Sequence, residues 1–185
     1  MTNWQILPMF ARPIAITKID DEKTKAVQKL ASNVMWFASK EQQDIEIAYS
    51  KKDNVLKGEL QEYFLDLSAD LIGEFGYQCD IQMTRSYFRK SDPSGFTWED
   101  CNPGSWFTAI FWWEDYTEES GSIKFSCDPD PYGQPKEWNV WSSPWIDIYP
   151  DKGALCVFPS TMRNRLTANQ SEVSRKELMF HFVPK

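Results

Sequence analysis

The chain has 185 residues and a mass of 21.6 kDa, the usual size of one domain, and at this size roughly 70% of the unfolded surface can be buried. Twenty basic residues against 27 acidic ones give a net charge of −7, which disfavours a nucleic-acid partner because phosphate binding needs clustered Lys and Arg. A composition that is 42% hydrophobic and 15% aromatic excludes a disordered chain and predicts a core rich in aromatic rings.

The first twenty residues contain no long apolar run, since Pro8 and Pro13 interrupt them. We therefore expect neither a signal peptide nor a membrane span, and we expect a cytoplasmic protein without a membrane partner. The four cysteines, Cys79, Cys101, Cys127 and Cys156, form no C-x-x-C pair, which predicts four reduced thiols rather than a zinc site or a disulfide framework.

Two helices are predicted in the first half of the chain. Residues 6–19 have the period of an extended segment and predict a short edge strand. Asp20 can cap a helix whose apolar face carries Val27, Leu30, Val34 and Phe37. A longer helix is predicted over 54–75, where Leu and Phe recur at helical spacing for five turns before Gly76 permits a stop.

After Gly76 the apolar residues alternate with polar ones, which predicts strands. Turn-rich stretches at 91–95, 118–121, 128–135 and 151–153 separate these segments, as in a β-sandwich or a jelly roll. We predict one α+β domain over residues 1–185, with the two helices packed on one sheet. The six expected strands lie around 79–83, 107–111, 123–125, 146–148, 155–157 and 178–182.

Three segments in the second half of the chain form one set of motifs. They are the run Asp100-Cys-Asn-Pro-Gly-Ser105 with the aromatic strand that follows it, the run Gly153-Ala-Leu-Cys-Val-Phe-Pro-Ser160, and Arg175 at the start of the last predicted strand. Together they resemble one enzyme family, the 2-oxoglutarate and iron(II) dependent oxygenases. In that family the first reads His-x-His-Pro-Asn-Ser, and a distal iron-binding histidine lies four residues after the Ser of the second. The resemblance implies a double-stranded β-helix fold.

The same segments depart from the family at the positions of its iron ligands. The enzymes need a facial triad of two His and one carboxylate, whereas the corresponding residues here are Asp100, Asn102 and Asn164. An amide oxygen binds iron(II) more weakly than an imidazole does, so we expect no bound metal and no cofactor. The single histidine, His181, stands where the family has Asn and is interpreted as a structural or surface residue. If the chain were active, the resemblance would imply iron(II) and 2-oxoglutarate.

Arg175 is kept at the position where the family holds the carboxylate of its co-substrate. A buried guanidinium needs an anionic or carbonyl partner, which a small dicarboxylate or an internal acid could supply. The alternative is an exposed Arg175 beside Glu172 and Glu177 on a solvated face. Asp100 in turn could pair with an arginine in place of a metal ion, the candidates being Arg89, Arg163 and Arg165.

Tryptophan is concentrated in a proline-bounded stretch, where Trp138, Trp141 and Trp145 are either packing residues or an interaction surface. Our leading hypothesis is a non-catalytic oxygenase-like domain that binds another protein or itself. Because the family is frequent in bacteria and their tailed phages, a phage-encoded structural or virion-assembly component is expected. The alternatives are a dioxygenase with an atypical metal site and a small-carboxylate-binding module that uses Arg175.

Overall fold

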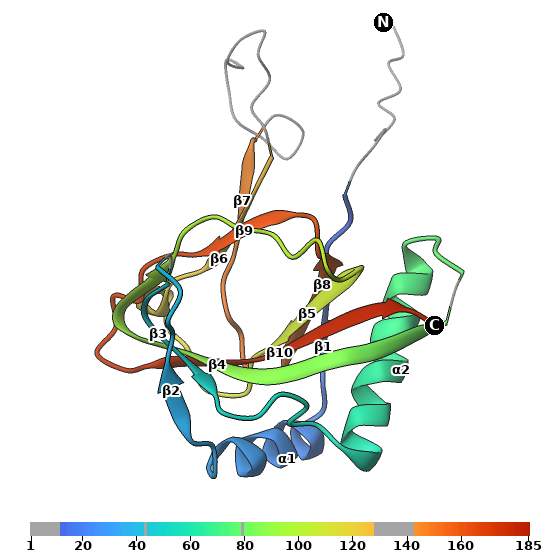
Figure 1. The fold of residues 1–185 in the computed structure, drawn as a ribbon, viewed down its shortest axis with the longest axis horizontal. Helices are drawn as coiled ribbons and strands as arrows, with labels where there is room; N and C mark the ends of the chain where they lie inside the picture. The colour runs from blue at the N-terminus through green and yellow to red at the C-terminus, as the bar shows by residue number, and fades with distance from the viewer. Residues whose placement is uncertain (1–11, 43, 79, 128–142) are drawn as a thin grey trace, which may run out of the picture.

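The computed structural model describes residues 12–42, 44–78, 80–127 and 143–185, which form two antiparallel sheets and two α-helices (Figure 1). The sheets face each other as the two walls of a jelly roll. The large sheet contains, in spatial order, β1 (Ala15–Lys18), β8 (Ala154–Pro159), β5 (Phe107–Phe111), β10 (Arg175–Pro184), β4 (Ile81–Thr97), β3 (Asp44–Ser50) and β2 (Trp36–Ala38). The small sheet contains β7 (Trp145–Ile148), β6 (Ile123–Ser126) and β9 (Arg163–Leu166).

Both helices lie along the outer face of the large sheet (Figure 1). Helix α1 (Asp21–Ala31) begins after Asp20, whose carboxylate accepts a hydrogen bond from the Lys23 backbone N–H at 2.8 Å. Helix α2 (Gly58–Glu74) buries Phe64 against Phe111 and Phe180 of the sheet. The predicted α+β fold, with two helices on one sheet of a double-stranded β-helix, is confirmed.

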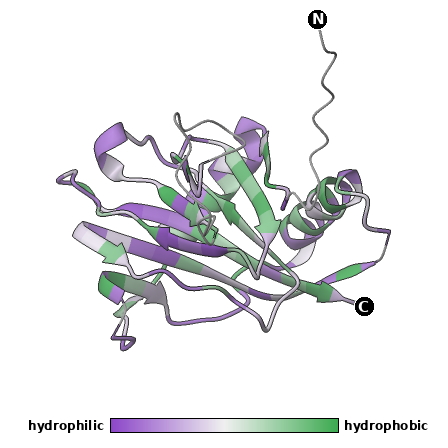
Figure 2. Ribbon diagram, turned by 90° about the horizontal axis from the view of Figure 1, so that it is seen from above, coloured by the Kyte–Doolittle hydropathy of each residue, from purple (hydrophilic) through white to green (hydrophobic). Residues whose placement is uncertain are grey.

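The two faces of the large sheet serve different interiors. Along β10, Leu178, Phe180 and Phe182 pack into the core under the helices, whereas Met179 belongs to a second core inside the jelly roll. Successive residues of a strand point alternately to these two faces, and the long strands carry both hydrophobic and hydrophilic residues (Figure 2). This alternation decides which side chains reach the interior of the barrel.

Several element boundaries differ from the sequence prediction. Helix α1 ends at Ala31 because the Ser32 hydroxyl and backbone N–H turn back to the carbonyls of the last turn, so Phe37 lies in β2 rather than on the helix. The predicted turn at 91–95 lies within β4, where the register against β3 shifts and Ser94 takes a positive φ of 68°. Strands β2, β3 and β9 were not predicted.

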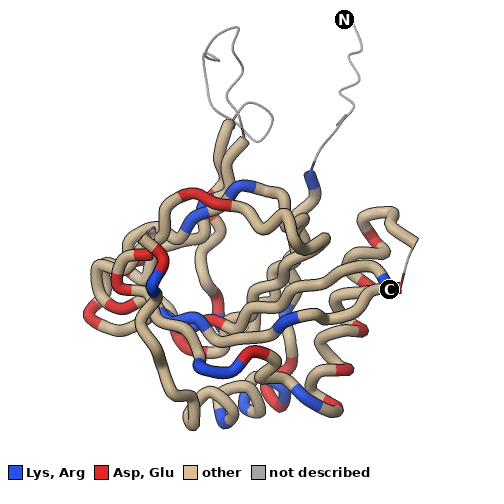
Figure 3. The backbone as a smooth tube through the Cα atoms, in the orientation of Figure 1, with Lys and Arg blue, Asp and Glu red and all other residues tan. Residues whose placement is uncertain are grey.

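The described cysteines, Cys101, Cys127 and Cys156, are free thiols, and Cys79 lies outside the described residues. Lys and Arg are interspersed with Asp and Glu along the described chain (Figure 3). Neither of the two described helices is long and apolar enough to cross a membrane.

Candidate functional site

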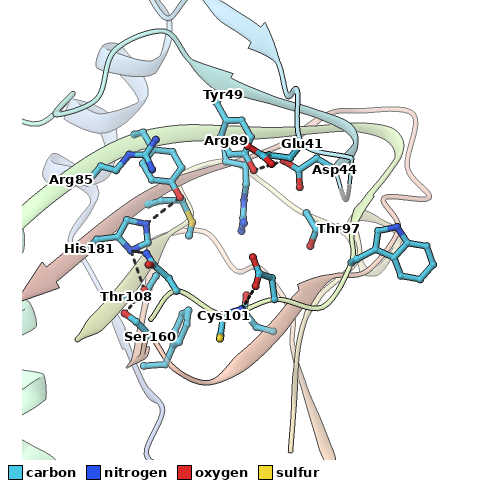
Figure 4. Close-up of a pocket in the computed structure, with 17 residues that line it drawn as sticks. Glu41, Asp44, Tyr49, Arg85, Arg89, Thr97, Cys101, Thr108, Ser160 and His181 are labelled. Atoms are coloured by element: carbon cyan, nitrogen blue, oxygen red, sulfur yellow. Dashed lines mark hydrogen bonds between the residues drawn. The ribbon is translucent and has the colours of Figure 1, made fainter. Parts of the chain in front are cut away.

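A cavity of about 320 Å³ opens into the jelly roll between the large sheet and the segment that leads to β5 (Figure 4). Strands β3, β4 and β10 supply one wall, and residues 98–102 with the ends of β8 and β9 supply the other. The side chains that line it are mostly polar: Glu41, Asp44, Tyr49, Arg85, Tyr87, Arg89, Thr97, Trp98, Asp100, Cys101, Asn102, Thr108, Phe158, Ser160, Asn164, Met179 and His181.

The structure brings Asp100, Asn102 and Asn164 to this one cavity. Asp100 and Asn164 form a β-bridge, with backbone hydrogen bonds of 3.0 and 2.8 Å in the two directions. The Asn102 backbone N–H donates to the Ser160 carbonyl at 2.8 Å. Two of the three segments that carry the family resemblance are thus held together by the main chain.

Both the nitrogen and the oxygen of the Asn102 side-chain amide make polar contacts within the chain. Its Nδ2 lies 3.1 Å from His181 Nδ1 and donates to Ser105 Oγ at 3.2 Å, while its Oδ1 accepts from the Gly104 backbone N–H at 3.2 Å. Asn164 Nδ2 donates to the Met162 carbonyl at 3.0 Å.

These side chains do not fit an iron(II) centre. Two amides with one carboxylate lack the imidazoles that iron(II) prefers. In the described part of the chain, no cluster of three or more His, Cys, Asp and Glu side chains could hold a metal ion. No chemical step through iron is therefore derived for this site.

His181 is a structural residue of the cavity wall. Tyr87 Oη lies 3.2 Å from Nε2, and Thr108 Oγ1 lies 3.1 Å from Nδ1, the nitrogen that Asn102 also approaches (Figure 4). Burial, followed by the charges of Arg85 and Arg89, lowers the pKa of His181 to about 4. The imidazole is therefore neutral near pH 7. Because the Asn102 amide donates to Nδ1, the proton belongs on Nε2.

Arg175 is buried, so the alternative of an exposed residue on a solvated face is wrong, and Glu177 is buried as well. Arg175 Nη1 donates to the carbonyls of Ser120 at 2.9 Å and Ser122 at 3.5 Å. Burial lowers the pKa of this guanidinium, and the nearby Glu177 opposes that shift. Arg175 is not among the residues that line the cavity.

The ion pair inside the barrel joins Arg89 and Glu177, which are direct cross-strand neighbours on β4 and β10. Arg89 Nε lies 2.9 Å from Glu177 Oε1, and Trp112 Nε1 donates to Glu177 Oε2 at 3.2 Å. Sequence reasoning considered Arg89 only as a partner for Asp100 and missed this pair. The signal was the two-residue period, which places Glu177 on the same face of β10 as Met179 and His181.

The predicted tryptophan surface is only partly visible. Trp138 and Trp141 lie outside the described residues. Trp145 begins β7, is 45% exposed, and has Lys124 Nζ 5.6 Å from its ring centre.

Comparison with known proteins gives a likeness in fold. No protein-family model matches the chain, and no curated protein matches it. Among solved structures, an oxidoreductase of the 2OG-Fe(II) oxygenase family from Burkholderia pseudomallei superposes with a TM-score of 0.69 at 11% identity, over 92% of this chain and 85% of that one.

Two further structures agree with this result. The non-heme alpha ketoglutarate dependent epimerase SnoN from nogalamycin biosynthesis gives a TM-score of 0.69 at 12% identity, over 94% of this chain and 79% of that one. A Pseudomonas putida prolyl-4-hydroxylase gives 0.64 at 13% identity, over 94% of both chains. The chain therefore has the double-stranded β-helix fold of the 2-oxoglutarate and iron(II) dependent oxygenases, as the sequence motifs predicted.

Proposed function

We propose that the chain is a non-catalytic domain with the oxygenase fold, kept for contact with another protein or with a second copy of itself. The observation that carries the non-catalytic part is the engagement of Asn102. Its Oδ1, the amide atom that could coordinate a metal ion, already accepts from the Gly104 backbone N–H, and the contacts of Nδ2 with His181 and Ser105 hold the amide in that orientation. An amide ligand gains too little from iron(II) to offset the loss of these contacts.

The positive charge of Arg89 also disfavours the binding of a metal ion. Its guanidinium lines the cavity that Asp100 and Asn164 share, and a fixed positive charge there repels a divalent cation. Glu177 neutralises one side of Arg89 but does not line the cavity. A metal ion held by Asp100 and the two amides would therefore also be exposed to the positive charge of a guanidinium.

An exposed apolar surface supports the contact part of the proposal. Ile16 of the edge strand β1 and Ile146 and Tyr149 at the edge strand β7 line one shallow cavity, and Ile146 is 52% exposed. Trp145 precedes Ile146 in β7. Exposed apolar side chains that gather beside two strands at the ends of their sheets, as the described residues show them, are typical of protein interaction sites. Assembly into a tailed-phage virion would be one such use and stays a prediction.

Iron binding tests the non-catalytic part. Iron(II) added anaerobically at a hundred times its Kd would stabilise a binding protein by about 2.7 kcal/mol, a shift of several degrees in the melting temperature. We expect no shift for this chain, with or without 2-oxoglutarate. Succinate formed from 2-oxoglutarate at turnover rates would overturn the proposal in favour of a dioxygenase with an atypical metal site.

Restoring the imidazoles tests the assignment of the ligand positions. The double variant Asn102→His/Asn164→His should bind iron(II) or zinc more tightly than either single variant, because coordination needs all ligands at once. The control Asn102→Ala/Asn164→Ala loses the same amide contacts without adding ligands. Equal metal affinity of the two double variants would show that these are not the ligand positions.

Self-association and partner capture test the contact surface. Trp145→Ala/Ile146→Ser should weaken assembly measured by light scattering, or capture by pull-down, while the melting temperature stays within a few degrees. Trp98→Ala is the matched control, since Trp98 is 59% exposed and lies in the segment after β4. A wild-type chain that stays monomeric and captures nothing would contradict this part.

A further inference from the structure

The interior of the jelly roll contains more buried positive than negative charge around Glu177. The guanidinium groups of Arg89 and Arg175 both lie near the single Glu177 carboxylate, which is fully buried. Three buried donors, Arg89 Nη2, Arg175 Nε and Arg175 Nη2, have no hydrogen-bond partner among the described residues. Buried donors of a charged group are costly to leave unpaired.

Of these two arginines, only Arg89 lines the cavity. Its residue is 8% exposed, its Nε is fixed by Glu177, and its side chain reaches from β4 into the cavity (Figure 4). Arg85, the other lining arginine, is held by Asp53 at 2.9 Å. The Arg89 guanidinium, fixed at Nε and unpaired at Nη2, therefore places a positive charge at the cavity wall that can hold one anionic group of a ligand.

The remaining charges of the cavity have the opposite sign. Glu41 and Asp100 are exposed lining residues, and Asp44 is partly buried. Asp44 Oδ2 accepts from Ser39 Oγ at 2.6 Å and from Tyr49 Oη at 2.8 Å, which fixes its position. A ligand that enters the cavity thus passes acidic side chains before it meets the buried guanidinium.

We propose that this cavity binds a small amino-acid-like zwitterion, with its carboxylate on Arg89 and its ammonium group toward Asp44 and Asp100. The volume of about 320 Å³ is sufficient for such a molecule. A dianion would satisfy Arg89 equally well, but the acidic side chains repel its second charge. This binding needs no metal ion and does not depend on the non-catalytic proposal.

A matched series of four-carbon probes tests the charge pattern. We would titrate the full chain, in the presence of a chelator, with γ-aminobutyrate, butyrate, succinate and n-butylamine, and measure binding by calorimetry and ligand-observed NMR. γ-Aminobutyrate should bind at least about tenfold more tightly than the other three, because only it meets both charges. No saturable binding of γ-aminobutyrate, or succinate binding as tightly, would overturn the proposal.

Variants assign the two ends of the ligand. Arg89→Lys should weaken γ-aminobutyrate about tenfold or more, since an ammonium cannot hold Glu177 and the ligand with the same fork geometry. Lys152→Gln, which removes a positive charge outside the cavity, is the control and should leave the affinity unchanged. Asp100→Asn should reduce the preference for γ-aminobutyrate over butyrate.

Folding of each variant is checked by thermal unfolding. If Arg89→Lys does not fold, Arg89→Met/Glu177→Met removes the buried pair as a unit and should also lose γ-aminobutyrate binding. Unchanged affinity in the folded Arg89 variant, or an unchanged preference in Asp100→Asn, would contradict the assignment.

Discussion

The two interiors of this molecule are lined by opposite faces of the same strands, yet they differ in chemistry. The core between the large sheet and the helices is built of aliphatic and aromatic side chains, among them Phe64, Phe111 and Phe180. The interior of the jelly roll adds Arg89, Glu177 and other buried polar groups to its apolar residues. Alternate residues of one strand can therefore have different roles: those on one face stabilise the apolar core, and those on the other face line the polar interior.

Phe64→Ala should have the largest effect on stability, because it removes the ring at the centre of the helix-covered core. Phe64 is fully buried, and its ring centroid lies 5.2 Å from that of Phe111 and 4.9 Å from that of Phe180. We expect a loss at the upper end of about 3–5 kcal/mol in the free energy of unfolding, measured by denaturant titration. Trp98→Ala is the control and should change it by less than about 1 kcal/mol.

Glu177→Gln, inside the jelly roll, should lower the free energy of unfolding by about 3 kcal/mol. The variant leaves two guanidinium groups without their shared carboxylate. Gln can keep one hydrogen bond to Trp112, so the loss stays below that of Phe64→Ala. Arg89→Met/Glu177→Met should recover most of the stability, because apolar residues of similar size need no partner. A double variant as unstable as Glu177→Gln would contradict this expectation. It would show that apolar residues cannot replace the ion pair at this position.

Acid should destabilise the polar interior through His181. Its pKa is lowered to about 4 in the folded chain, from about 6.5 when unfolded, so the unfolded state binds the proton first. The contribution, about 3 kcal/mol, is fully present above pH 6.5 and is lost as the pH falls toward 4. The difference in unfolding free energy between wild type and His181→Asn, followed from pH 7 to pH 4, should show this slope. A difference that does not change with pH would contradict it.

The helix cap should give the smallest effect, at the edge of the apolar core. Asp20→Ala removes the acceptor of the Lys23 backbone N–H and should cost about 1 kcal/mol of unfolding free energy. Asp21→Ala, one residue further along, removes a similar charge from the helix start without removing the cap. Equal losses in the two variants would mean that charge near the helix dipole, rather than the hydrogen bond, is what matters.

The fold was largely predictable from sequence because strong patterns specify it. The long apolar period of α2 and the alternation of β5, β8 and β10 follow directly from burial. Strands β2 and β9 are short and largely exposed, so they carry little hydrophobic pattern. The Ser91–Gly95 segment contains turn residues, yet the neighbouring strand β3 extends the sheet past it through a bulge.

The candidate site was less predictable because it depends on pairing across strands. The motifs singled out Asp100, Asn102 and Asn164, and the structure brings these three residues to one cavity. The partner of Arg89 depends on the register of β4 against β10, which sets Arg89 opposite Glu177. No local pattern specifies that register to a single residue.

Strand β10 lies at the middle of the large sheet, between β5 and β4, although it is the last strand in the chain order. During synthesis, the edges of β4 and β5 that pair with β10 therefore stay unpaired until residues 175–184 have left the ribosome. Closing the sheet joins segments almost a hundred residues apart, such as Phe88 and Leu178, and such non-local pairing is intrinsically slow. The large sheet and the wall of the cavity therefore form together in one late step, and until then the unpaired strand edges are prone to aggregation.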